Sequence, residues 1–222
     1  MAFPLTHLFV AHEMMKNYDI KDRADFLLGC LAPDAVHYRK SFVGASMGLI
    51  GQAKKVSHLC PVSNEKWGSV TDNEGWQNCV LNFLREKEQT PFRLGYATHV
   101  LTDIYNNKTL WSNFRTQNPL EAKKGYKSAY YDDLKHIDSL LKCDRVVTEE
   151  ICEKLSRASA VGIEGLVSSE EVEAIKQTMI LEYGYVSQTS SSDKKYSTKF
   201  VSYDEMLIFI KEAAHFTTAI VF

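Results

Sequence analysis

The stretch from Thr90 to Asp103 most constrains the fold, because it combines a strong helix start with polar residues at helical spacing inside an apolar run. Thr90 can cap the helix, and Pro91 fits its first turn. His99 and Asp103 are four residues apart, so their side chains lie on one face. An imidazole and a carboxylate placed in this way can share a divalent ion, and zinc accepts both ligands. Gly95, one turn earlier, would let another backbone or a metal cluster approach.

A His/Asp pair on a helix is more often a simple hydrogen-bonded pair than a metal site, so further ligands are needed. Three other segments place His7, Asp34 and His58 within or beside apolar runs, where a polar side chain without a partner is costly. Several such groups can satisfy one another by sharing a metal ion. The segments read Thr6-His7-Leu8, Ala32-Pro33-Asp34 and Ser57-His58-Leu59.

These four motifs, in this order, resemble the zinc-dependent phospholipase C family, whose superfamily also includes single-strand-specific zinc nucleases. The resemblance covers about the first half of the chain. It implies an all-α fold and hydrolysis of phosphate esters by a metal-activated water. It also implies that Asp103 bridges two ions, that His7 helps to hold the second ion, and that Asp34 acts catalytically on the water. The ligands of the first ion would be Asp34, His58, His99 and Asp103.

The chain departs from the family pattern in two places. Secreted members use a processed N-terminal amino group as a ligand, whereas here Met1–Leu5 precedes the first histidine motif without an obvious maturation site. The family's third ion uses further histidines and a glutamate, but the residues directly after Asp103, Ile104–Asn107, include no histidine. We therefore expect one or two ions, zinc or another divalent metal, rather than three.

Five weaker candidates lie outside the four motifs. His37 follows Asp34 closely, and Asp138 falls on the apolar face of a predicted helix, where a carboxylate needs a partner. Asp132 and His136 are four residues apart and could form a ligand pair, although a solvated pair is more usual. Asp133 lies in the same segment.

Helical patterns extend over most of the chain, and no strand pattern competes with them. We predict one all-α domain over residues 1–222, with the ligand motifs within residues 1–110. Glycine-rich residues 39–55 and Ser- and Lys-rich residues at about 186–200 are predicted as loops, and His215 as a packed core histidine. The predicted helices cover Leu5–Asn17, Arg23–Leu31 capped by Asp22, Asp72 or Asn73 to Glu88, Lys127–Leu141 and Tyr203–Ile220, with capping boxes at Ser168/Glu171 and Ser202/Glu205.

Composition limits the binding partners and the cellular compartment that we expect. A formal net charge of -2 argues against general nucleic-acid binding, although a nucleotide or short strand could still be a substrate. The five cysteines are widely spaced, which favours free buried thiols in a reducing compartment. There is no signal-peptide pattern and no apolar run long enough for a bilayer, so we expect a cytoplasmic protein.

Three functions are compatible with these patterns. The first is a hydrolase acting on a small phosphate-ester or phospholipid-type substrate. The second is a nucleotide phosphohydrolase with His/Asp ligands, although that class usually carries adjacent His-Asp, which is missing here. The third is a non-catalytic protein in which a metal only ties helices together. Serine-hydrolase and P-loop motifs are also missing, so neither chemistry is expected.

Overall fold

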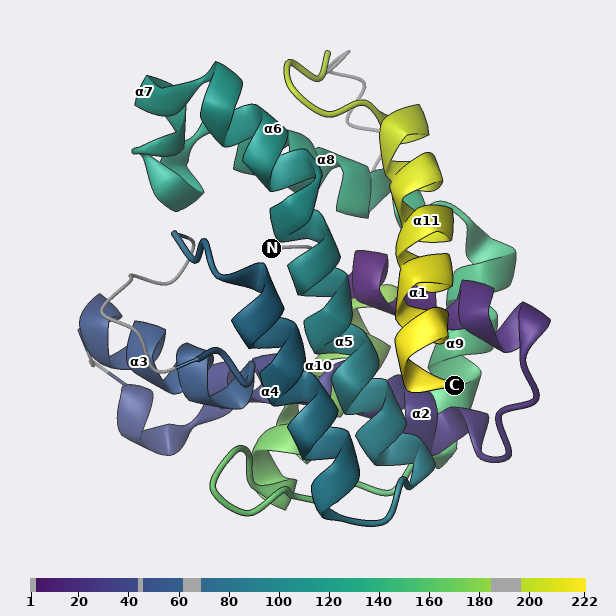
Figure 1. The fold of residues 1–222 in the computed structure, drawn as a ribbon. Coiled ribbons are helices and arrows are strands. Elements are labelled where there is room, and N and C mark those ends of the chain that lie inside the picture. Colours follow the sequence, from purple (N-terminus) through teal and green to yellow (C-terminus); the bar gives the residue numbers. More distant parts are fainter. Residues whose placement is uncertain (1–2, 44–45, 62–68, 185–196) are drawn as a thin grey trace.

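The computed structural model describes residues 3–43, 46–61, 69–184 and 197–222, and it is all-helical over these ranges apart from an isolated β-bridge between Ile163 and Val167. Figure 1 shows the arrangement. The α-helices are α1 (Pro4–Asn17), α2 (Arg23–Gly29), α3 (Met47–Ser57), α4 (Asn73–Glu86), α5 (Pro91–Lys108), α6 (Leu110–Gln117), α7 (Pro119–Ala122), α8 (Ala129–Leu141), α9 (Arg145–Arg157), α10 (Ser169–Gly184) and α11 (Tyr203–Val221). Three 3-10 helices complete the set: η1 (Ala32–Tyr38), η2 (Lys40–Phe42) and η3 (Gly125–Lys127).

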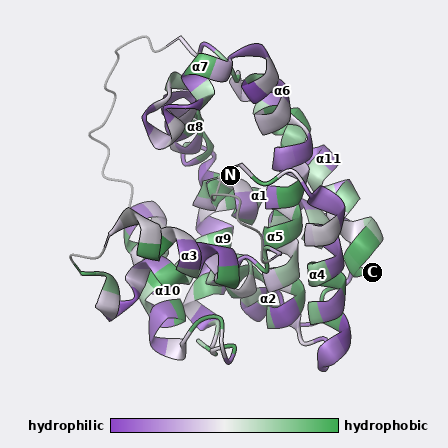
Figure 2. Ribbon diagram, turned by 60° about the vertical axis from the view of Figure 1, so that its left-hand side comes forward, coloured by the Kyte–Doolittle hydropathy of each residue, from purple (hydrophilic) through white to green (hydrophobic). Residues whose placement is uncertain are grey.

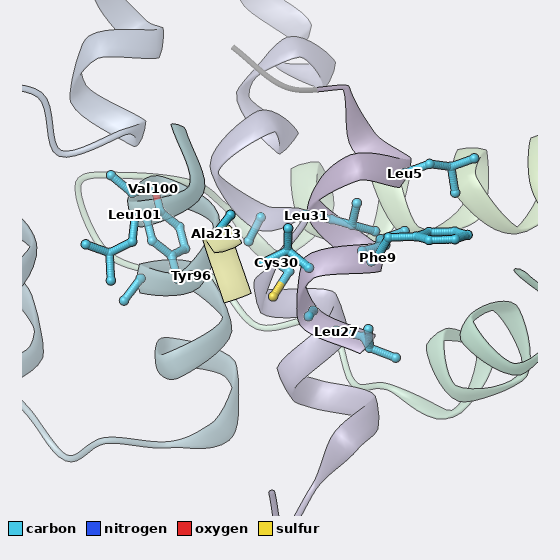
Figure 3. Close-up of a cluster of buried hydrophobic side chains, with 14 of the residues drawn as sticks. Leu5, Phe9, Leu27, Cys30, Leu31, Tyr96, Val100, Leu101 and Ala213 are labelled. Atoms are coloured by element: carbon cyan, nitrogen blue, oxygen red, sulfur yellow. The ribbon is translucent and has the colours of Figure 1, made fainter. Parts of the chain in front are cut away.

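Helix α5 lies at the centre of the molecule and contacts α1, α2, α4, α6, α11 and η1 (Figure 1). Most of its side chains are buried, as expected for a helix that is covered on all sides. Figure 3 shows apolar side chains of α5 meeting those of α1, α2 and α11 in one core. The labelled residues there include Leu5, Phe9, Leu27, Leu31, Tyr96, Val100, Leu101 and Ala213.

Helices α2 and α5 approach each other so closely that each needs a glycine. A Cβ atom at Gly95 would lie 2.0 Å from the carbonyl oxygen of Phe26, and one at Gly29 would lie 2.1 Å from that of Phe92. Both distances are far below van der Waals contact. The close backbone approach expected at Gly95 is therefore confirmed, and its partner is α2.

The N-terminal helix caps that the sequence predicts are also present in the structure. Thr90 Oγ1 accepts a hydrogen bond from the Arg93 amide, and Asp22 caps α2. Ser202 and Glu205 form a reciprocal capping box at the start of α11. The aromatic side chains Trp111, Phe114, Tyr130 and Tyr131 pack together and join α6 to α8, at the upper end of the view in Figure 2.

The prediction of a loop over residues 39–55 is wrong from residue 47 onward, where α3 forms. Ser46 caps this helix by accepting a hydrogen bond from the Leu49 amide. Gly48 and Gly51 lie inside it, although each glycine costs about 1 kcal/mol relative to alanine. Packing of α3 against η1 offsets this cost. The loop expected at about 186–200 lies mostly outside the described residues.

Two further expectations need correction. His215 is not a core residue: it is exposed on the polar face of α11, one turn after the exposed Lys211. No disulfide joins any of the five cysteines, as expected, but only Cys30 and Cys152 are buried, and Cys143 is exposed. Among the described helices, none is both long enough and apolar enough to cross a membrane.

Candidate metal centre

Five of the sequence-predicted residues, which we call the cluster, meet at one buried place: His7, Asp34, His58, His99 and Asp103. They come from α1, η1, the C-terminal end of α3, and α5. The cluster contains two sets of potential ligand atoms, and within each set the atoms lie within 4.8 Å of one another. The sets are His7 with His99 and Asp103, and Asp34 with His58 and His99. Asp34 is partly exposed, while the other four residues are at most 1% exposed.

The orientation of His99 follows from the close contact between α2 and α5. Its Nδ1 lies 2.7 Å from the carbonyl oxygen of Cys30, at the end of α2. Because a carbonyl can only accept a hydrogen bond, Nδ1 carries a proton, and in the neutral ring Nε2 then has the lone pair. A carbonyl at a helix end thus fixes the tautomer that a metal ligand requires.

His58 is fixed in the same way at the end of α3. Its Nδ1 lies 3.0 Å from the carbonyl oxygen of Lys54 and 3.0 Å from Ser57 Oγ. The proton is again on Nδ1, so Nε2 carries the lone pair. The indole of Trp76 donates to the His58 carbonyl oxygen at 2.7 Å, and the Tyr96 hydroxyl donates to that of Ser57. These bonds attach the end of α3 to α4 and α5.

Nε2 of His58 and Nε2 of His99 are 3.2 Å apart, so in the neutral rings with Nδ1 protonated the two lone pairs face each other. Such an arrangement is repulsive unless a cation lies between them. Burial lowers the pKa of His58 to about 4, so this ring is neutral at pH 7. Two nitrogens bound at 2.0–2.1 Å to one tetrahedral zinc would be about 3.3–3.4 Å apart, close to the separation found here.

The carboxylates lie at fitting distances from the same nitrogens. Asp34 Oδ1 is 3.4 Å from His58 Nε2. Asp103 Oδ2 is 3.7 Å from His58 Nε2 and 4.0 Å from His99 Nε2. Histidine nitrogens and carboxylate oxygens are donors that zinc accepts, and Asp34, His58 and His99 form a set whose ligand atoms lie within 4.8 Å of one another, so these three residues fit an ion.

His7 forms the other set of close ligand atoms, together with His99 and Asp103. His7 Nε2 lies 3.6 Å from Asp103 Oδ1, the other oxygen of that carboxylate. The His7 and His99 rings are stacked, with centroids 3.7 Å apart and an interplanar angle of 7°. Because an imidazole binds an ion in its ring plane, parallel stacked rings suit two ions rather than one. Both ring nitrogens of His7 are buried and make no hydrogen bond within the described part of the chain.

One residue of the centre, Lys54, was not identified in the sequence analysis. Lys54 is 6% exposed, and its Nζ lies 2.9 Å from Asp34 Oδ1. Burial alone would raise the pKa of Asp34, but the ammonium of Lys54 holds it well below its usual range. In the sequence the only signal is the position of Lys54 one helical turn before His58, inside a segment that we expected to be a loop.

The weaker candidates lie at the edge of the cluster or away from it. His37 Nε2 is 3.8 Å from Asp34 Oδ1, with a side chain 44% exposed. Asp133 accepts backbone hydrogen bonds from residues 199, 200 and 201, and Asp138 accepts from the Leu5 amide and the Tyr183 hydroxyl. Asp132 pairs on the surface with Lys135, 3.3 Å away. Neither set of ligand atoms found in the described residues includes Asp132, Asp133, His136 or Asp138.

Comparisons of the chain with models of known families, with curated proteins and with solved structures give no significant match. The geometry of the centre shows a helical protein that brings histidines and aspartates together in a cluster that could hold a metal ion.

Proposed function

We propose that this protein is a metal-dependent hydrolase of phosphate esters, with zinc as the favoured metal, as the phospholipase C resemblance implies. The observation that carries the proposal is the pair of facing Nε2 atoms of His58 and His99, 3.2 Å apart and each turned inward by a backbone carbonyl. Two carboxylates complete the donor set. A merely hydrogen-bonded histidine cluster would place a proton between two such nitrogens.

Each side chain of the cluster has a role in this proposal. Asp34, His58, His99 and Asp103 would hold one ion, while His7 and the second oxygen of Asp103 would contribute to another. Zinc in such a site polarises phosphoryl oxygens and lowers the pKa of a bound water to about 7. Asp103 would keep the two ions together, because its two oxygens face different histidines.

Asp34 is the best placed of the five to act on water. It is the partly exposed member of the cluster, so solvent and substrate reach the centre from its side. A carboxylate held in the ionised form by Lys54 can accept a hydrogen bond from an attacking water and orient it. This accessibility supports a reactive site, in which water would join the four residues as a fifth ligand of the ion, over a closed structural site.

The deciding experiment measures metal content and turnover on the same preparation. Elemental analysis should give one or two zinc equivalents, and the loaded protein should hydrolyse bis-nitrophenyl phosphate. The variant Asp34→Asn should turn over more slowly at a measured zinc content. No bound metal, together with no stabilisation by added zinc, would overturn the proposal. Bound zinc without turnover of any phosphodiester, phosphomonoester or phospholipid would instead favour the structural role.

A further inference from the structure

Lys54 is unusual because it brings a positive charge into a centre that would also hold cations. It projects from α3 one turn before His58 and is almost fully buried. Buried lysines are rare unless they are paired. The ammonium lies 2.9 Å from Asp34 Oδ1, the oxygen that is also 3.4 Å from His58 Nε2.

The charges around Lys54 can be counted group by group. The two carboxylates of the cluster contribute -2 and Lys54 contributes +1, while a histidine must be neutral to bind a metal ion. The sum without metal is therefore -1. One divalent ion brings the sum to +1 and two bring it to +3. Once an ion is bound, the ammonium is not needed to neutralise the ligands, and it repels the metal.

We propose that the Lys54 ammonium binds a phosphoryl oxygen of the substrate beside Asp34. This inference rests on the proposed function, because it assumes bound metal and a phosphate ester. The surplus positive charge is compensated when an anion enters, and a lysine ammonium is a common point-charge ligand for phosphate. Asp34 is the partly exposed member of the cluster, and the Lys54 ammonium lies directly beside it. Lys54 is then a substrate-binding residue.

The competing explanation is that Lys54 only holds Asp34 in place. The two roles predict opposite changes when the charge is removed. If Lys54 binds substrate, its neutral replacement should weaken phosphate binding, while zinc binds more tightly because a competing cation has gone. If Lys54 only positions Asp34, the same replacement should weaken zinc binding and leave phosphate binding to the loaded protein unchanged.

The experiment compares the wild type with Lys54→Met and Lys54→Arg by titration calorimetry. Zinc is titrated into the metal-free proteins, and inorganic phosphate into the zinc-loaded proteins. We expect Lys54→Met to bind phosphate about tenfold more weakly and zinc severalfold more tightly, and Lys54→Arg to keep most of the phosphate affinity. The matched control is Lys176→Met, which removes a buried lysine of α10 that binds the Ala158 carbonyl and Glu173, and it should change neither affinity.

Each outcome has a distinct meaning. Phosphate binding that is equal in wild type and Lys54→Met overturns the inference while the proposed function survives. A wild type that binds no zinc in the first titration overturns the proposed function before phosphate is tested. If Lys54→Met does not fold, the wild type labelled with ¹⁵N-lysine replaces it. Phosphate should then shift the Lys54 Nζ resonance and not that of Lys176, and an unmoved Lys54 resonance overturns the inference.

Discussion

Two regions of this protein that bury carboxylates differ in the surroundings they give them. On α8, Asp133 accepts three backbone hydrogen bonds at 2.6–3.2 Å, and Asp138 accepts one from the Leu5 amide at 3.1 Å and one from the Tyr183 hydroxyl at 2.8 Å. In the cluster, Asp103 instead faces ring nitrogens of three histidines at 3.6–4.0 Å. These separations are too long for hydrogen bonds and suitable for ligands around an ion.

The comparison shows how a structural carboxylate can be told from a candidate ligand when both are buried. Asp133 and Asp138 connect segments distant in sequence, because donors from the chain itself fill their lone-pair positions. Asp103 has imidazole nitrogens of three histidines around its two oxygens, and Nε2 of His58, whose Nδ1 is protonated, turns a lone pair towards it. Burial alone therefore does not identify a site. The chemical type of the neighbouring atoms does.

The largest effect is expected for Asp103→Ala. This change removes a ligand shared by two ions, so zinc affinity should fall by about a thousandfold, beyond the 10–100-fold typical of residues that only support ligands. Competition with a fluorescent chelator measures it. His136→Ala on α8 is the control and should keep wild-type affinity. If His136→Ala loses the metal while Asp103→Ala retains it, the centre has been assigned to the wrong helix.

A smaller effect of another kind is expected for Asp133→Ala. Three backbone amides just before α11 lose their acceptor, and one of them is buried, so the free energy of unfolding should fall by about 1–3 kcal/mol. Urea denaturation measures the change. Zinc affinity should stay at the wild-type value. An Asp133→Ala variant with normal stability and weakened zinc binding would contradict the distinction between structural carboxylates on α8 and candidate ligands in the cluster.

The smallest effect concerns Asp138, and it depends on pH. Burial raises the pKa of Asp138 to about 6, above its usual value near 3.9. Its contribution to stability is therefore fully present below about pH 4 and is lost as the pH rises through 6. Asp138→Asn keeps an acceptor for the Leu5 amide without the charge. It should be about 1–2 kcal/mol more stable than wild type at pH 8.

The gain of Asp138→Asn should shrink as the pH is lowered from 8 to 5. Urea denaturation at the two pH values gives the comparison, and Asp138→Ala, which removes the acceptor, should be destabilised at both. A constant difference between wild type and Asp138→Asn across this range would show that the carboxyl does not titrate there.

Local signals predicted a large part of the fold. Thr90, Asp22 and Ser202 cap the helices expected of them, because a cap depends on only a few neighbouring residues. Helix α3 was missed because its glycines suggest a loop, while the contacts that stabilise it are tertiary. His215 was misplaced although the helical period puts it on the same face as Lys211, which is solvent-exposed.

The membership of the cluster could be proposed from the order of four short motifs, but its internal arrangement could not. The tautomers of His58 and His99 depend on the carbonyl oxygens of Lys54 and Cys30. Every residue has a backbone carbonyl, so the sequence does not show which carbonyl faces which histidine. The ion pair of Lys54 with Asp34 joins residues twenty positions apart and forms only when α3 packs on η1. Such features appear only when distant segments meet.

The glycine contact between α2 and α5 has a consequence for mutational scanning. Spreading the two backbones by about 1 Å would stretch the 2.7 Å hydrogen bond from His99 to the Cys30 carbonyl beyond its working length. The imidazole could then move its proton to Nε2, and the nitrogen that faces the cluster would have no lone pair for an ion. In a screen for metal retention, substitutions at Gly29 and Gly95 should therefore lose metal as substitutions of the histidines do, although neither glycine has a side chain that could touch a metal.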